Sequence, residues 1–231
     1  MDHSMRRGSG RLSLLMTVGV LLIGGIGAPA LLAAPARGAV VPCGSASPSC
    51  SMTGTLSLTA GPLTLTTPST LGWSHTVTGL DQQLVDFTPA DETYSVDDAT
   101  GAAAGWHVTV SATTFTTGTL SLPNTGTFSA NGSLSSIGAT GYPSTTCATG
   151  STCTMPTHTT APTTYPVAIT TAASSPATSV IYDADANSGL GSVTIGGSSS
   201  DDPVGWWLAV PANAKPGSYT STISLAVVTA P

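Results

Sequence analysis

The stretch Gly105-Trp106-His107-Val108-Thr109-Val110 carries the clearest β-strand signal of this 231-residue chain. Side chains alternate between the two faces of a strand, so its tryptophan and both valines share one face. The pattern returns in Gly205-Trp206-Trp207-Leu208-Ala209-Val210, again with a tryptophan and two aliphatic residues on one face. A strand face of this kind is usually buried. We therefore expect Trp106 and Trp206 to anchor a hydrophobic core.

Trp207 lies on the opposite face of the second stretch, where the first stretch has His107. An outward tryptophan at this place, close to an acidic pair, would stack on a sugar ring or on a partner protein, because exposed aromatic side chains mark binding surfaces. The alternative is burial under a loop. We predict that Trp207 makes the contact, and that Trp106, Trp206 and Leu208 shape the strands beneath it.

Alternation of apolar and polar residues continues on both sides of these stretches. It includes Leu56 and Leu58 ahead of a Gly-Pro turn signal, the stretch 73–77, and the stretch 219–227, in which every second residue from Ile223 on is apolar. No stretch after the first 36 residues shows a convincing helical period. We predict an all-β fold, an antiparallel β-sandwich with Ig-like, Greek-key connections and about nine to twelve short strands.

Residues 135–164 differ from the rest because Thr, Ser, Gly and Pro dominate and apolar residues are few. A long structureless loop is unusual inside a compact domain, so we interpret this segment as a surface loop insertion stapled by a disulfide. An even number of cysteines in an exported chain indicates disulfides, and the pairs Cys43–Cys50 and Cys147–Cys153 are the simplest of the possible connectivities. The cysteines lack the C-x-x-C spacing typical of a metal site.

Residues 1–36 have the pattern of a secretory signal peptide. Three arginines precede a long run without charge, and Ala34-Pro35-Ala36 offers the small residues that a signal peptidase requires. The alternative is a single membrane anchor, which glycines and prolines inside the apolar run disfavour. We expect cleavage after residue 36, a flexible lead-in at 37–53 and one β-sandwich domain at 54–231. The chain should therefore be secreted or held at the cell surface.

The charge balance excludes several classes of partner. Eleven acidic residues stand against five basic ones, and Arg37 and Lys215 are the only basic residues beyond the leader. Nucleic-acid affinity comes mainly from Lys and Arg that displace counterions. We therefore expect no nucleic-acid partner, and no membrane partner once the signal is cleaved. A disordered Ser/Thr/Pro stalk is the alternative for such a composition, but regular alternation and four tryptophans disfavour it.

Catalytic motifs are not evident, because the sequence contains neither G-x-S-x-G nor H-E-x-x-H. Paired acids at 91–92, 97–98 and 201–202 lie beside Gly, Pro or Thr, where turns favour Asp. We expect no catalytic residues and no cofactor.

The stretch from Asp183 to Gly189 has oxygen-bearing side chains at alternate positions, which suit Ca²⁺. Its glycine, however, falls one position late for an EF-hand loop. An Asx-rich turn is the favoured interpretation. The alternative is a calcium site at Asp183, Asp185 and Asn187.

Several further segments follow one another in a recognisable order. They are the turn Val96-Asp97-Asp98-Ala99-Thr100-Gly101 ahead of Gly105-Trp106, the stretch 182–191, Val210-Pro211-Ala212-Asn213-Ala214, and Pro216-Gly217-Ser218-Tyr219-Thr220-Ser221-Thr222. In this order, on an exported β chain, they resemble the WxL-domain family of Gram-positive cell-surface proteins.

The chain departs from that family at both of its motifs. The first reads Trp106-His107-Val108. Trp206-Trp207-Leu208 spells W-x-L, but it lies one strand earlier than the family's second motif, and the last strand has Leu225-Ala226-Val227 in its place. The chain resembles a divergent, actinobacterial type of the family.

The resemblance implies a non-catalytic surface protein that associates non-covalently with the cell wall, through peptidoglycan or through a wall partner. The chain has no L-P-x-T-G sorting motif, which favours non-covalent retention or release. The alternative is a structural or adhesive subunit that pairs through sheet edges with itself or with companion surface proteins.

Overall fold

The structure is a computed structural model, and it describes residues 52–124, 128–137, 140–159, 165–197 and 203–230. The chain divides into Met1–Thr55 and a compact unit, Leu56–Pro231, which contains all the strands of the described residues. The expected leader, most of the expected lead-in, and Cys43 and Cys50 lie outside the described residues. Among the residues that are described, none belongs to a helix long and apolar enough to cross a membrane.

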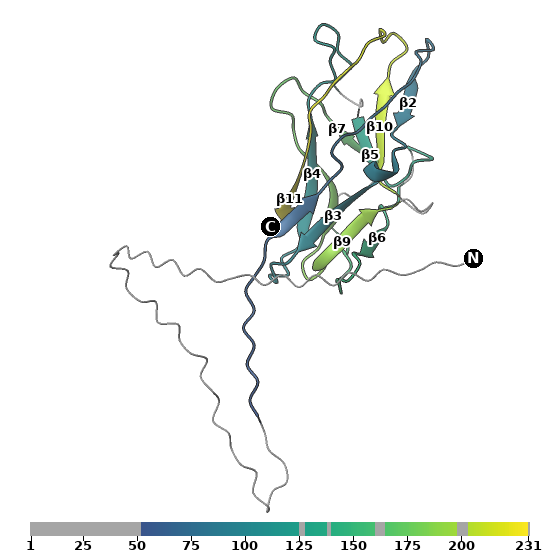
Figure 1. The fold of residues 1–231 in the computed structure, drawn as a ribbon. Coiled ribbons are helices and arrows are strands. Elements are labelled where there is room, and N and C mark those ends of the chain that lie inside the picture. Colours follow the sequence, from purple (N-terminus) through teal and green to yellow (C-terminus); the bar gives the residue numbers. More distant parts are fainter. Residues whose placement is uncertain (1–51, 125–127, 138–139, 160–164, 198–202, 231) are drawn as a thin grey trace, which may run out of the picture. The chain divides into compact units, whose positions relative to one another are not determined.

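The described part of the unit is built from strands in three antiparallel sheets (Figure 1). The β3 sheet has the order β1 (Leu63–Thr66), β3 (Thr93–Asp98), β9 (Gly191–Gly196) and β6 (Thr145–Cys147). The β10 sheet has the order β2 (Gln82–Val85), β10 (Gly205–Val210), β5 (Phe128–Asn131) and β7 (Val167–Ile169). The β4 sheet has the order β11 (Ile223–Thr229), β4 (Trp106–Ala112) and β8 (Ser179–Ala184). A single 3-10 turn, η1 (Pro89–Asp91), joins β2 to β3.

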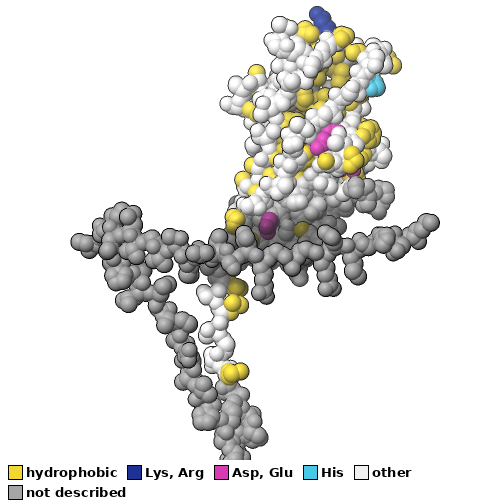
Figure 2. All heavy atoms as spheres, in the orientation of Figure 1, with side chains coloured by type: hydrophobic (Ala, Val, Ile, Leu, Met, Phe, Trp, Pro, Cys, Tyr) yellow, Lys and Arg dark blue, Asp and Glu magenta, His cyan; other side chains and the backbone are white. Residues whose placement is uncertain are grey.

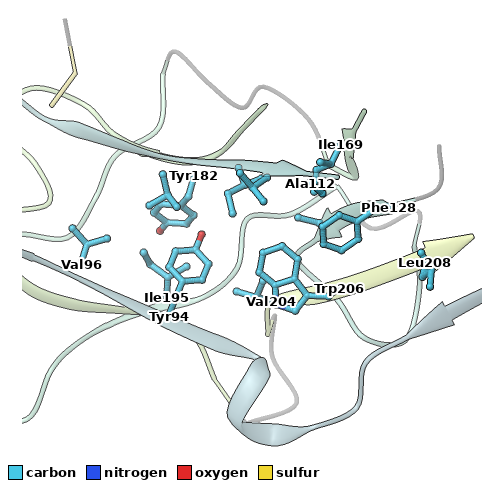
Figure 3. Close-up of a cluster of buried hydrophobic side chains, with 14 of the residues drawn as sticks. Tyr94, Val96, Ala112, Phe128, Ile169, Tyr182, Ile195, Val204, Trp206 and Leu208 are labelled. Carbon is cyan, nitrogen blue, oxygen red and sulfur yellow. The ribbon is translucent and has the colours of Figure 1, made fainter. Parts of the chain in front are cut away.

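The core lies between the β4 sheet and the other two sheets. Figure 3 shows Tyr94 and Ile195 of the β3 sheet pointing toward Tyr182 of the β4 sheet, and Trp206 of the β10 sheet beside Phe128. The ring centroids of Tyr94 and Tyr182 lie 6.4 Å apart, edge to face. This packing of sheet against sheet confirms the predicted all-β sandwich. The Ig-like, Greek-key connection stays a prediction.

Both predicted tryptophan strands form, and their inward faces are buried as expected. Trp106 and Trp206 are among the largest fully buried side chains. Packing requires the glycine before each tryptophan. A Cβ on Gly105 would lie 2.4 Å from the Ala184 carbonyl oxygen, and a Cβ on Gly205 would lie 2.2 Å from the Ser133 carbonyl oxygen. Only glycine allows backbone to approach backbone this closely.

Two expected strands do not form. Leu56 and Leu58 lie in a segment without strand pairing and are 82% and 84% exposed. The stretch 73–77 alternates in sequence, but it is an extended connection and not part of a sheet. Alternation by itself creates a strand only where a second strand is placed to pair with it.

The surface loop insertion expected at 135–164 carries the expected disulfide, but it also contributes a strand. Its residues Thr145–Cys147 form β6, which pairs with β9 and makes the last strand of the β3 sheet. An edge strand needs backbone hydrogen bonds more than apolar side chains, so a Thr-rich segment suffices there. The predicted Cys147–Cys153 disulfide is confirmed, and it closes the loop that follows β6.

Candidate functional site

The described residues form a largely apolar cleft with a volume of about 920 Å³. It opens between β11 and the segment 68–77, which connects β1 to β2. Figure 2 shows hydrophobic side chains gathered at the end of the unit that also carries the basic side chain, and Lys215 is the only Lys or Arg in the described ranges. A cleft of this size and character is the default candidate for a binding site.

Apolar and aromatic side chains from several parts of the chain line the cleft. Leu71 and Trp73 come from segment 68–77, Leu84 from β2, and Ile223 and Leu225 from β11. Four further lining residues lie deeper and are buried: Phe115, Leu122, Trp206 and Leu208. The inner end of the cleft therefore belongs to the core, whereas its walls remain half-exposed.

Segment 68–77 is held in place by hydrogen bonds although it forms no strand. The indole Nε1 of Trp73 donates to the backbone oxygen of Trp206 over 3.1 Å. The Gly72 amide donates to Oδ2 of Asp86 over 2.7 Å. Trp73 also meets Phe115 and Phe128 edge to face, with ring centroids 5.9 and 5.7 Å apart. One wall of the cleft is thus fixed by two donors and two aromatic contacts.

The other wall is β11, which lies at the edge of the β4 sheet. Its side chains alternate between half-buried and exposed, and Ile223, Leu225 and Val227 are the half-buried ones that pack against the core. This confirms the predicted parity of the last strand. Among the described residues, strand pairing of β11 occurs on the β4 side alone. On its other side β11 lies near β1 without pairing to it, so the backbone groups of that edge are not used in a sheet of the described residues.

The cleft carries almost no charge. Lys215 and His75 are its ionisable lining residues apart from Tyr219, and no acidic side chain lines it. The Tyr219 hydroxyl donates to the Lys215 backbone oxygen over 3.0 Å, which fixes the loop at the rim. A lining of this kind favours an uncharged, apolar occupant over a charged one, because burying an unpaired charge is costly.

Acidic residues gather behind the cleft rather than in it. Asp86, Asp91 and Glu92 are buried, and Asp86 accepts hydrogen bonds from the amides of Gly72 and Thr88. Burial, followed by the negative charge of Asp86, raises the pKa of Asp91 to about 6. The same two causes raise the pKa of Glu92. Of these three carboxylates, that of Asp86 accepts the backbone hydrogen bonds, and the turn role expected for the pair at 91–92 stays a prediction.

The expectation that Trp207 faces outward is wrong. Its side chain is 8% exposed, and its indole Nε1 donates to the Ser133 backbone oxygen over 3.1 Å. The loop after β5 covers it, held by the Asn131 side chain, whose Nδ2 donates to the backbone oxygens of Ser133 and Ser136. Burial under a loop, the alternative considered for this residue, is therefore what occurs. The neighbouring Leu208 is 6% exposed and lines the cleft from within.

The residues of the possible calcium site are engaged in turn and loop contacts. Oδ1 of Asp185 accepts hydrogen bonds from the amide and hydroxyl of Thr159, and Oδ2 accepts one from the Thr157 hydroxyl. Asp183 is buried, with Oδ1 3.3 Å from Nδ1 of His158. In the described ranges, no three His, Cys, Asp or Glu side chains converge as they would around a metal ion.

His158 lies in an aromatic cluster with Tyr142 and Tyr182. Its ring stacks on Tyr142, with centroids 3.9 Å apart, and meets Tyr182 edge to face. Burial, followed by the charges of Asp183 and Asp185, raises the pKa of Tyr142 to about 12. The insertion 135–164 thus supplies two aromatic side chains that extend the core.

The cleft was not predicted from the sequence, although some of its residues stood out there. Trp73 lies in an alternating stretch, and Ile223 and Leu225 lie in the last strand. The signal that would have pointed to the cleft is that both stretches have an apolar face. A half-buried apolar face needs a cover from elsewhere in the fold. Of the four residues assigned to the expected binding region, Trp206 and Leu208 line the cleft, whereas Trp106 and the expected contact residue Trp207 do not.

Comparison of the chain with protein-family models, with curated proteins and with solved structures finds no match. The likeness to the WxL family therefore depends on the quoted sequence segments alone and stays a prediction.

Proposed function

We propose that this chain is an exported, non-catalytic surface protein that acts as a structural subunit at the bacterial cell wall. In this proposal the apolar cleft accepts an extended segment of another polypeptide. The observation that carries it is the position of the cleft along β11, an edge strand whose inward side chains Ile223 and Leu225 remain half-exposed.

The chemistry of such a site follows from strand geometry. An added segment would pair its backbone with the open edge of β11, and every second side chain would enter the cleft. Main-chain hydrogen bonds would supply affinity, and the shape and apolar lining of the cleft would supply specificity. The lining favours aliphatic side chains at alternate positions, separated by small polar ones that face solvent.

This proposal selects the second of the two functions expected from the sequence. Direct binding of wall glycan was assigned chiefly to an outward Trp207, and that side chain is covered by the loop after β5. Retention at the wall remains part of the proposal, but through a protein contact.

Photo-cross-linking in the producing cell tests the proposed function. A photo-reactive residue replaces Thr70, which is exposed and lines the cleft, and in a control chain it replaces Thr149, which is exposed in the disulfide loop and does not line it. We expect covalent protein adducts in the wall fraction from position 70 and none from position 149. Equal adduct formation from both positions, or none from position 70, would overturn the proposed function.

A further inference from the structure

We propose that the segment Thr55–Thr59 of a second copy of this chain, here called the donor segment, occupies the cleft as an added strand beside β11. The inference depends on the proposed function and names the partner of that site. It predicts that the chain assembles with itself, each copy offering a donor segment and an acceptor cleft.

The donor segment has the side-chain pattern that the cleft requires. It reads Thr55-Leu56-Ser57-Leu58-Thr59, so both leucines share one face of an extended chain. Leu56 is 82% and Leu58 is 84% exposed, and no strand of the described residues pairs with this segment. Two large aliphatic side chains on one face of an unpaired segment are typical of a strand that pairs with another molecule.

The chain contains the same short sequence again inside the folded unit. Gly54-Thr55-Leu56-Ser57-Leu58 is identical to Gly118-Thr119-Leu120-Ser121-Leu122. The related Thr222-Ile223-Ser224-Leu225 leads into β11, which begins at Ile223. In the second occurrence of this sequence, Leu122 is 5% exposed and lines the cleft. In β11, the isoleucine and the leucine form the cleft wall. Side chains of this pattern thus already surround the cleft from two sides.

The donor segment cannot fill the cleft of its own copy. Gly61 is pinned beside Ala99, because its amide donates to the Ala99 backbone oxygen over 2.8 Å. From there β1 leads to Pro68, the first residue of segment 68–77, seven positions further on. Leu58 and Leu56 precede Gly61 by three and five positions. If the chain folded back along β1 from Gly61, the two leucines would reach the level of Thr64 and Thr66, short of segment 68–77.

Charge also favours this occupant. The donor segment has no ionisable side chain and therefore brings no charge into the cleft, whose own Lys215 lies exposed at the rim. The whole chain has a formal net charge of −6, so copies repel one another at a distance. Salt screens that repulsion and does not weaken apolar burial, and we therefore expect assembly to become stronger as salt is added.

The first experiment measures assembly of the chain from residue 37 on by size-exclusion chromatography with light scattering, over a range of concentrations. We expect oligomers that increase with concentration, and their loss in Leu56→Asp/Leu58→Asp. Because both leucines are exposed, this variant should fold normally, which circular dichroism checks. Phe87→Asp is the matched control, since Phe87 is 69% exposed and does not line the cleft. It should assemble like the wild type. Equal assembly of the wild type and the leucine variant would overturn the inference.

The second experiment adds the donor segment as a free peptide, residues 53–60, to the Leu56→Asp/Leu58→Asp chain. Trp73 and Trp206 line the cleft, so tryptophan fluorescence reports its occupation. We expect saturable binding that is weakened at least about tenfold when Ser57 and Leu58 are exchanged in the peptide, because adjacent leucines point to opposite faces. Equal binding of both peptides, or of neither, would overturn the inference.

The cross-link at position 70 separates this inference from the proposed function. An adduct that contains the chain's own residues 53–60 supports both. An adduct with a different protein supports the proposed function and overturns the inference of a second copy. A cross-link formed within one copy has the mass of a single chain. Such a product overturns the inference as well.

Discussion

The indole Nε1 of Trp206 lies 2.9 Å from the backbone oxygen of Asp91, to which its N–H donates, across a sequence separation of 115. The same ring stacks on Phe128 with centroids 5.7 Å apart, and it lines the inner end of the cleft. The bond therefore ties β10 to the turn η1 and sets the orientation of the ring at the inner end of the proposed acceptor site.

Replacement of Trp206 by Phe should destabilise the protein. Phe keeps an aromatic ring against Phe128 but removes the indole donor, which leaves the Asp91 oxygen without this partner in a buried place. We expect a loss of about 1–3 kcal/mol in the free energy of unfolding, measured by urea denaturation. Val228→Ala, at a residue that is 40% exposed, serves as control and should change little. Equal stability of Trp206→Phe and wild type would contradict the assigned hydrogen bond.

Replacement of Trp207 by Ala distinguishes a buried role from a wall contact. Because the side chain lies under the loop after β5, we expect the free energy of unfolding to fall by roughly 3 kcal/mol. Retention of the folded variant on purified cell walls, measured by co-sedimentation at a temperature where it remains folded, should match that of the wild type. Loss of retention with unchanged stability would instead restore Trp207 as a contact residue.

Stability should depend on pH through Asp91. Its pKa is raised from 3.8 to about 6 in the folded protein, so between these values the native state binds more protons than the unfolded state. This contribution therefore favours folding below the lower value and is lost as pH rises through the upper one. The raised pKa of Glu92 acts in the same direction.

Asp91→Asn removes the titration and should flatten this part of the profile. The measurement is the free energy of unfolding of both proteins at several values between about pH 4 and pH 7, a range that spans the shift. We expect the advantage of wild type over variant to shrink as pH rises. An advantage that grows with pH would show that the carboxylate is stabilised, not penalised, in the folded protein.

Calcium tests the role of Asp185. Its carboxylate accepts hydrogen bonds from Thr157 and Thr159, so we expect Asp185→Ala to lower the melting temperature by the same amount with and without added Ca²⁺. A site at Asp183, Asp185 and Asn187 would instead give the wild type a higher melting temperature in Ca²⁺, and the variant would lose that increase. Thermal denaturation in Ca²⁺ and in chelator distinguishes the two.

Local sequence patterns correctly predicted those strands that pair with other regular strands. The faces of 106–110, 205–210 and 223–227 followed from alternation, because parity is a property of one strand and needs no knowledge of its neighbours. The Cys147–Cys153 pair followed from its short spacing and from the even number of cysteines. Burial of Trp106 and Trp206 followed from their apolar neighbours on the same face.

The tertiary structure alone decided what covers each face. Parity placed Trp207 opposite Trp206, but only the course of the loop after β5 buries it. Alternation made Leu56 and Leu58 strand-like, but no strand of the described unit is placed to pair with them. The cleft arises because β11 and segment 68–77 stand apart. A side chain's face is a local property of the backbone, whereas its cover depends on contacts between residues distant in sequence, which alternation does not encode.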